Sequence, residues 1–241
     1  TRGYVVAAVI DGNHGGLEAG LVVEGRDSHF PVVADLAQAT DLARKAGTQP
    51  THFVFGIAPD GGRLTAQQWH DVKAAIEAGL NVDCGLHQYI SEDETLSGLA
   101  RRQGVCLRDV RKPPPIDELH FFSGKIDQVD SLKIAVLGTD SAVGKRTTAQ
   151  LLVQTLNSAG VATEMIGTGQ TAWMQGVRYG LILDSLVNDF VSGEIEHAVW
   201  SAWNERHPAA IVIEGQGSLM NPAYPGGFEI LAAGRPDLIV L

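Results

Sequence analysis

The sequence predicts an α/β protein whose sheets are mainly parallel. Two observations support this fold class. Short apolar runs alternate with helical patterns along the first part of the chain, and a buried strand later runs directly into a glycine-rich loop and an amphipathic helix. The 241 residues are 44% hydrophobic and 19% charged, which is enough to bury a real core. We therefore expect one large or two small α/β units.

The first part of the chain is expected to hold five strands and three helices. Ser91 and Glu94 have the spacing of a capping box, and Gly79 and Gly104 stand where helices should end. The segment RKPPP, at 111–115, cannot continue a helix or donate to a central strand, so a domain boundary is expected there. The expected strands are 4–10, 30–35, 51–58, 81–86 and 104–110, and the expected helices are 35–47, 65–80 and 91–104.

A second unit is expected to begin with the strand SLKIAVLG at 131–138. This strand leads into the glycine-rich loop and a helix from about Lys145 to Ser158. The chain begins at Thr1 without Met and stops in an apolar strand, so we expect the native protein to continue beyond Leu241. Later strands are expected at 161–167, 209–215 and 237–241, and the domains at 1–115 and 131–241 with a linker at 116–130.

Composition and charge restrict the partners. The formal net charge of −10 would repel a phosphodiester backbone, so we expect a small-molecule substrate and no nucleic acid. No apolar run reaches the roughly 18 residues of a membrane span and no signal peptide is evident, so a cytoplasmic protein is expected. A homo-oligomer is left open. Cys84 and Cys106 are expected as buried free thiols, and the acids from Asp184 to Glu196 as a solvated helix face.

The loop LGTDSAVGKRTTA, at 137–149, nearly matches a phosphate-binding P-loop. The usual pattern is G-x-x-x-x-G-K-[ST], in which backbone N–H groups cradle phosphates and the hydroxyl holds Mg²⁺. Here Gly138 stands one residue early and Arg146 replaces the hydroxyl. A guanidinium cannot bind Mg²⁺ but can contact a phosphate. We therefore predict a phosphate site that uses cations more than metal, formed by Gly138, Thr139, Asp140, Ser141, Ala142, Val143, Gly144, Lys145, Arg146, Thr147 and Thr148.

Glu214 is the first candidate for catalysis. The apolar strand at 209–215 delivers it to the carboxyl end of a parallel sheet, where ligands bind in open α/β folds. We therefore expect Glu214 to face the same crevice as Lys145. A metal ligand, a general base and a structural salt bridge to Lys145 or Arg146 all remain open.

Other candidates follow strand ends. His87 stands where an acid or base could act, although an isolated His is more often structural. Arg63, in the glycine turn at 56–64, could contact a carboxylate, and Gln170 could line the crevice. Neither this turn nor the loop at 11–16 has the G-x-G-x-x-G pattern, so NAD binding is disfavoured.

Taken together, six segments resemble those of the D-glutamate N-acetyltransferase family, long catalogued as uncharacterised P-loop proteins. The resemblance runs from about Val5 to Leu241. It implies a Rossmann-like N-terminal domain, a P-loop NTPase-like α/β domain with a mainly parallel sheet, and transfer of acetyl from acetyl-CoA to the amine of D-glutamate. The segments are GIAPDGGRL, GLHQYISED, DVRKPPP, LGTDSAVGKRTTA, IGTGQTAWMQG and IEGQGSLMNPAYPG.

The implied chemistry suits the altered loop. Coenzyme A carries a pyrophosphate and a 3′-phosphate but no γ-phosphate to hydrolyse, so a backbone cradle with two cations suffices and no metal is expected. Acyl transfer also needs a base, for which Glu214 and His87 are the candidates. Cations must bind the substrate carboxylates, and the substrate-binding candidates are Arg63, Arg111, Lys112, Gln170 and Arg178.

Two other classes remain open from the sequence. The loop also resembles that of dethiobiotin synthetase, which implies an ATP- and Mg²⁺-dependent ligase or kinase. In that case Thr147 would replace the missing hydroxyl and Glu214 would hold Mg²⁺. The other class is a non-catalytic nucleotide-binding regulator, which needs the loop but no base. The identity of the ligand separates the three classes.

Overall fold

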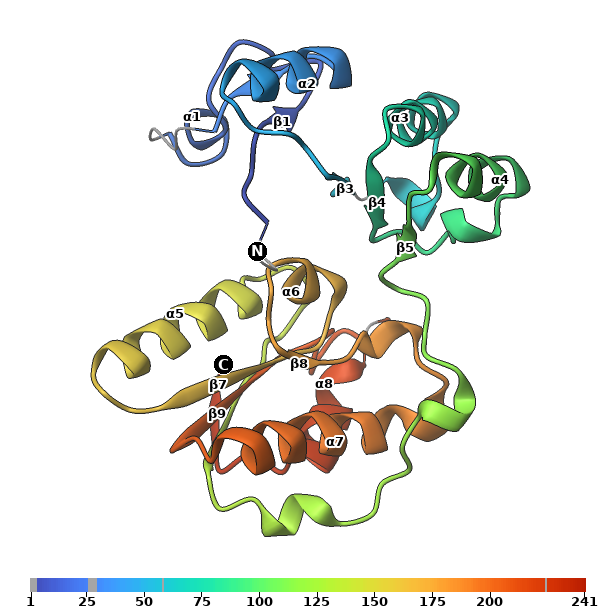
Figure 1. The fold of residues 1–241 in the computed structure, drawn as a ribbon. Helices are drawn as coiled ribbons and strands as arrows, with labels where there is room; N and C mark the ends of the chain where they lie inside the picture. The colour runs from blue at the N-terminus through green and yellow to red at the C-terminus, as the bar shows by residue number, and fades with distance from the viewer. Residues whose placement is uncertain (1–3, 26–29, 58, 224) are drawn as a thin grey trace. The chain divides into compact units, whose positions relative to one another are not determined.

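The structure is a computed structural model that describes residues 4–25, 30–57, 59–223 and 225–241. The chain forms two compact units, of which the first ends at Arg111 and the second begins at Lys112 (Figure 1). Each unit has parallel strands and a hydrophobic core of its own. Within the described ranges, no helix is long and apolar enough to cross a lipid bilayer.

The first unit alternates strands and helices, as the sequence predicts. Its elements are β1 (Val9–Ile10), α1 (Ala19–Glu24), β2 (Val32–Val33), α2 (Leu36–Lys45), β3 (His52–Phe55), α3 (Ala66–Glu77), β4 (Asn81–Cys84), α4 (Glu94–Gln103) and β5 (Leu107–Asp109). Strand β1 pairs with β2, and β3, β4 and β5 form a second sheet in that order; all these pairs are parallel. Ile76 of α3, Val82 of β4 and Leu96 of α4 are fully buried in one core cluster.

Local details of the first unit differ from the sequence prediction. Helix α1 is not predicted, because six residues are too few to show a helical period. The predicted capping box of Ser91 and Glu94 is wrong: Asp93 caps α4, and its carboxylate accepts the N–H groups of Thr95 and Leu96. The predicted stop at Gly104 is confirmed, since this residue ends α4 in the left-handed conformation.

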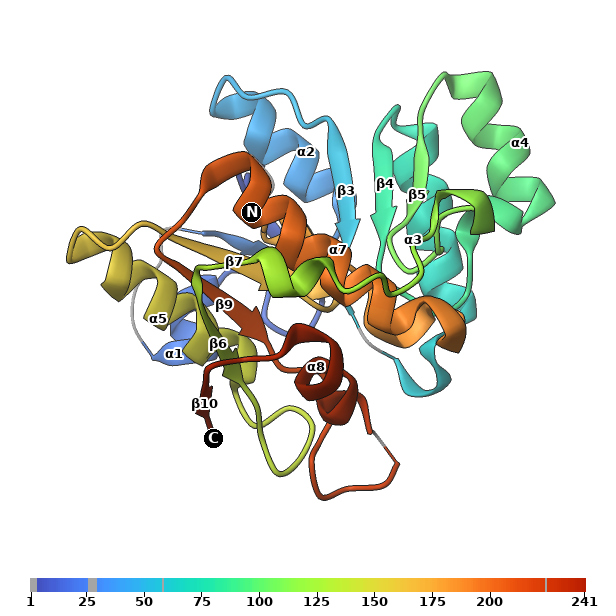
Figure 2. The ribbon, with the colours of Figure 1, turned by 90° about the horizontal axis from the view of Figure 1, so that it is seen from below.

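The second unit is a five-stranded sheet with helices on both faces. Its elements are β6 (Leu132–Val136), α5 (Lys145–Ser158), β7 (Thr163–Gly167), α6 (Gln170–Met174), β8 (Tyr179–Gly180), α7 (Asn188–Arg206), β9 (Ala210–Glu214), α8 (Gly226–Gly234) and β10 (Leu238–Val240). The strand order is β10-β6-β9-β7-β8, and every neighbouring pair is parallel. Helix α5 packs on one face and α7 on the other (Figures 1 and 2).

Strand β9 is buried on both faces, which its unbroken apolar run predicts. Val212 belongs to the core beneath α5, whereas Ile211 and Ile213 belong to the core beneath α7 and α8. The alternation follows from the period of two in a strand. Burial on both sides fixes the register of β9 and thereby the position of Glu214 at its carboxyl end.

The segment 116–130, which the sequence predicts as a linker, is instead packed onto α7. It contains short 3₁₀ helices, and Ile126 is part of the core of the second unit. The prediction of a solvated acidic face is wrong for Glu196, which is only 2% exposed. Its carboxylate accepts the N–H and hydroxyl of Ser123 and the N–H of Ile126, at 2.7 to 3.1 Å. Burial opposes ionisation of Glu196, but these hydrogen bonds outweigh it and lower its pKa.

Gly193 explains how the segment can approach α7 so closely. A β-carbon at this position would collide with the carbonyl oxygen of His120. Only glycine therefore allows the backbone of the segment to cross the helix at this point. The two cysteines also differ from each other: Cys84 is a buried free thiol as predicted, whereas Cys106, which comes just before β5, is exposed.

We expect Glu196→Ala to destabilise the second unit by about 2 to 4 kcal/mol, because the buried N–H of Ile126 and the two partly buried donors of Ser123 lose their acceptor. Urea unfolding measures this change. Glu118→Ala, at an exposed site in the same segment, should stay within about 0.5 kcal/mol of the parent. Equal stability of the two variants would contradict the assigned role of Glu196.

Candidate functional site

The loop after β6 follows the path of a P-loop. Gly144 ends it in the left-handed conformation, with φ 102° and ψ 8°, and α5 begins at the next residue. At Gly138, a β-carbon would come within 2.9 Å of Val143 and 3.3 Å of the Lys145 side chain. Ala142 is left-handed as well, with φ 56°, although it has a β-carbon. The loop therefore leads tightly into the first turn of α5, whose N–H groups lack acceptors inside the helix.

A second loop, residues 215–221, is tied to the P-loop by side-chain hydrogen bonds. The hydroxyl of Ser218 donates to the carbonyl oxygen of Thr139 at 2.6 Å, and its oxygen accepts the N–H of Asn221 at 2.7 Å. The side-chain amide of Asn221 in turn donates to the carboxylate of Asp140 at 3.0 Å. Since Ser218 is buried, its two bonds are partly shielded from water, whereas the bond between Asn221 and Asp140 is exposed. They hold the outer half of the P-loop in place.

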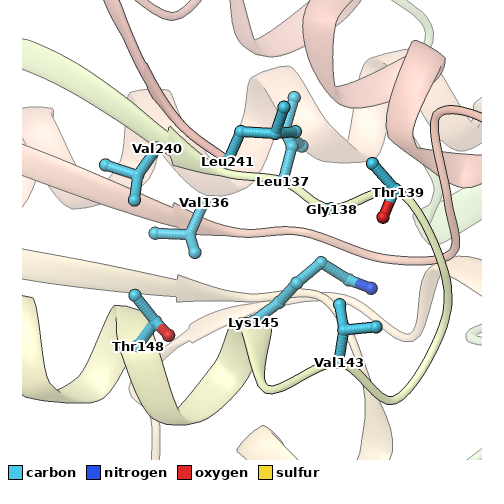
Figure 3. A pocket seen from close by; sticks show the side chains of 9 residues that line it. All are labelled: Val136, Leu137, Gly138, Thr139, Val143, Lys145, Thr148, Val240 and Leu241. Carbon is cyan, nitrogen blue, oxygen red and sulfur yellow. The ribbon is translucent and has the colours of Figure 1, made fainter.

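Lys145 folds back across the loop. Its ammonium donates to the carbonyl oxygen of Asp140 at 2.6 Å, and Figure 3 shows it between Thr139 and Val143. Partial burial lowers the pKa of Lys145, while the negative charges of Asp140 and Glu214 act in the opposite direction. The ammonium of Lys145 therefore lies against the loop, where it can contact a bound anion.

Glu214 stands at the carboxyl end of β9, in register with Val136 at the end of β6. Its side chain is buried, with the residue only 4% exposed, and one carboxylate oxygen accepts the N–H of Thr168 at 3.0 Å. Burial raises the pKa of Glu214; the hydrogen bond from Thr168 and the charges of Arg146 and Lys145 oppose this rise. The carboxyl group is therefore a candidate acid or base beside two cations.

A pocket of about 280 Å³ opens beside the loop (Figure 3). Residues 136–139 and the side chain of Lys145 line it on the P-loop side, and Val240 and Leu241 line it next to β10. The pocket thus combines apolar side chains with the backbone of the phosphate loop. A ligand with an anionic and an apolar part fits such a lining.

The remaining predicted residues of the second unit lie in different surroundings. Arg146 is half-buried at the start of α5, where it follows Lys145, and Gln170 is half-buried at the start of α6. Arg178 forms an ion pair with Glu205 at 3.2 Å and lines a smaller pocket of about 80 Å³. Thr147, Thr148 and Lys112 are exposed.

In the first unit, the structure brings the loops of three predicted residues together. Arg63 and His87 are exposed on the loops that follow β3 and β4. Arg111 follows β5 and is only 8% exposed, and its Nε donates to the carbonyl oxygen of Gly85 at 2.8 Å. These residues occupy the carboxyl edge of their own sheet, the edge where ligands bind in open α/β folds.

Sequence reasoning missed Ser218, Asn221 and Thr168. Ser218 and Asn221 lie in the segment IEGQGSLMNPAYPG, whose glycines allow a close approach of the backbone. A small polar residue within such a glycine-rich loop is the signal that could have pointed to Ser218. The partners of these side chains lie as far as 81 positions away in the sequence, so no local pattern names them.

The second unit defines the class of the protein. A buried parallel strand, a glycine-rich loop ending in Gly-Lys, a long helix and an acidic residue at the end of the neighbouring strand are the parts of a P-loop domain. It follows an α/β unit of parallel strands with crossover helices.

Comparison with known families identifies this chain more closely. Residues 120–241 match the domain of unknown function DUF1611_C, a P-loop domain, and residues 13–113 match DUF1611_N, a Rossmann-like domain. The chain belongs to the DUF1611 family. Similarity extends over 98% of the chain to the crystal structure of a DUF1611 family protein from Anabaena variabilis, with a TM-score of 0.85, 30% identity and 65% of that chain covered.

Two curated relatives carry the name D-glutamate N-acetyltransferase. The protein from a Pseudoalteromonas species is 31% identical over 190 residues, which cover 78% of this chain and 55% of the relative. The protein from Tritonibacter scottomollicae is 31% identical over 204 residues, which cover 83% of this chain and 57% of the relative. The chain thus spans little more than half the length of these relatives. The family resemblance predicted from the sequence is confirmed.

The raised pKa of Glu214 predicts a pH-dependent stability. The folded protein retains a proton on this carboxyl group that the unfolded chain releases, so stability from this group falls as pH rises from the ordinary Glu value through the folded pKa. Glu214→Gln lacks this titration, and its stability relative to the parent should improve over that window by about 1.4 kcal/mol for each unit of the shift.

Thermal unfolding of the two proteins from pH 4 to pH 8 measures the difference. Glu164→Gln, at a half-buried Glu of the same unit, serves as the control and should follow the parent. A constant difference between Glu214→Gln and the parent across this range would contradict the effect of burial on Glu214.

Proposed function

We propose that the protein transfers the acetyl group of acetyl-CoA to the amine of D-glutamate, with the P-loop holding phosphates of the coenzyme. The observation that carries the proposal is the pairing of Lys145 and Arg146 at the start of α5, where an ordinary P-loop has a Mg²⁺-binding hydroxyl after its Lys. The names of the two curated relatives support the same reaction.

The residues around the loop suit a coenzyme phosphate. The first turn of a 14-residue helix offers N–H groups and the positive end of its dipole. Lys145 adds a point charge, and Arg146 adds a fork of N–H donors that matches two phosphate oxygens. The adjoining pocket has apolar walls next to this loop and so offers room for a part of the ligand without charge. The proposed binding therefore needs no metal ion.

Glu214 is the proposed general base. Acyl transfer requires that the acceptor ammonium lose a proton before its nitrogen attacks the acetyl carbonyl. Burial raises the pKa of Glu214 and makes its carboxylate a stronger base, while Lys145 and Arg146 favour the ionised form that can take the proton. Thr168 holds one carboxylate oxygen, which leaves the other available for this task.

One observation favours a second function, an ATP- and Mg²⁺-dependent ligase or kinase. Glu214 ends the strand next to β6, and P-loop enzymes hold Mg²⁺ with an acidic residue at the end of a strand near the loop. In this function the exposed Thr147 would supply the hydroxyl that Arg146 replaces. The need for metal distinguishes the two functions.

The full-length protein should release free thiol from acetyl-CoA when D-glutamate is present, and this release should survive EDTA. A thiol-trapping assay, run with and without EDTA, measures both. L-glutamate and buffer alone serve as acceptor controls. ADP or phosphate formation from ATP, together with loss of activity in EDTA and its rescue by Mg²⁺, would assign the protein to the ligase class instead.

Lys145→Ala should weaken binding of acetyl-CoA by about 1.5 to 3 kcal/mol, the range for hydrogen bonds to charged groups. The fold should survive, because the Lys145 side chain is only partly buried. Calorimetric titration measures the affinity. Arg206→Ala removes an exposed cation from the same unit and should leave the affinity unchanged. Equal affinity of the Lys145→Ala variant and the parent would remove Lys145 from the coenzyme site.

A further inference from the structure

Three loops at the carboxyl edge of the sheet β3-β4-β5 are joined to one another. The N–H of Gln88 donates to the carbonyl oxygen of Gly62 at 3.1 Å, and the side-chain oxygen of Gln88 accepts the N–H of Leu64 at 2.9 Å. These two bonds join the loop after β3 to the loop after β4. Arg111 joins the latter loop to the end of β5 through its bond to Gly85. Hydrogen bonds therefore hold the three loops of this edge together.

The loop after β3 packs against His87 at the residue before Arg63. Gly61 and Gly62 are both left-handed, with φ 72° and 63°. A β-carbon at Gly62 would lie 2.6 Å from Cδ2 of His87, so the imidazole packs against the backbone directly before Arg63. Both side chains are exposed. Glycine adopts this conformation without steric cost, so the turn can bring its backbone against the imidazole.

The guanidinium of Arg63 is exposed at this edge. In the part of the chain that the structure describes, no ion pair engages the guanidinium of Arg63. By contrast, Arg111 is buried with its Nε on a carbonyl oxygen, and Arg178 of the other unit already pairs with Glu205. Of these three arginines, Arg63 is thus the exposed one with no ion pair among the described residues, whereas Arg111 holds the loops in position.

We propose that Arg63 and His87 form a carboxylate-binding site that holds one carboxylate of the amino-dicarboxylate acceptor. The planar fork of an Arg matches the two oxygens of a carboxylate, and the neighbouring imidazole can donate a further N–H. The site lies within the first unit. It rests on the proposed function, because that function supplies the dicarboxylate. In this proposal His87 binds substrate and does not act as a base.

Steady-state thiol release by the full-length protein tests this site with Arg63→Ala, Arg63→Lys and His87→Asn. Arg63→Ala should raise the KM for D-glutamate about 10- to 100-fold, as expected for a hydrogen bond between charged groups, with the KM for acetyl-CoA unchanged. Arg63→Lys keeps the charge but loses the fork, so its KM should fall between those of Arg63→Ala and the parent. Arg101→Ala removes an exposed cation of α4 and serves as the matched control.

D-glutamine, which lacks the side-chain carboxylate, identifies the group that is bound. If Arg63→Ala lowers the preference for D-glutamate over D-glutamine, the site holds the side-chain carboxylate; if both acceptors lose equally, it holds the carboxylate next to the amine. An unchanged KM for D-glutamate in Arg63→Ala and His87→Asn, with thiol release intact, would overturn this site alone. Absence of thiol release in the parent protein would instead overturn the proposed function.

Discussion

The parallel pairing of β6 with β9 is the constraint on which the candidate site depends. Because both strands run in the same direction and Val136 lies opposite Glu214, the phosphate loop and the buried carboxyl group emerge at the same edge of the sheet. Gly215 makes this closeness possible, since a β-carbon there would collide with the carbonyl oxygen of Val136. Ser218 and Asn221 then fasten the chain after β9 to the outer part of the loop. Sheet register, one glycine and a few hydrogen bonds thus give the site its shape.

Two cations stand at this edge of the sheet although the whole protein carries a net negative charge. The chain carries a formal net charge of −10, yet Lys145 and Arg146 stand together at the positive end of a helix. Burial penalises the charge of Lys145 and that of Glu214, and each partly offsets the penalty of the other. An anion at the loop would therefore meet two cations and the first N–H groups of α5, while salt screens the repulsion of distant charges within about 10 Å.

The sequence predicts the fold class and the central strands well, because apolar runs and glycine-rich loops are local signals. The bounds of α5, from Lys145 to Ser158, agree with the prediction. Sequence reasoning fails where a distant partner decides the outcome. The sequence predicts Glu196 as a solvated acid, but in the structure it is buried and accepts hydrogen bonds from Ser123 and Ile126. The positions of these donors relative to Glu196 follow only from tertiary packing. The roles of Ser218 and Thr168 are hidden for the same reason. Arg63 and His87 were singled out separately, and only the structure shows that their loops touch.

In the proposed function, the altered loop binds coenzyme phosphates with cations and backbone N–H groups in place of a metal. A crystal structure of the full-length protein with acetyl-CoA, grown without divalent metal, tests it most directly. We expect phosphate oxygens within hydrogen-bond distance of the first N–H groups of α5 and of Lys145 and Arg146. Coenzyme phosphates bound away from residues 138–148, or a loop filled only when ATP and Mg²⁺ are supplied, would contradict it.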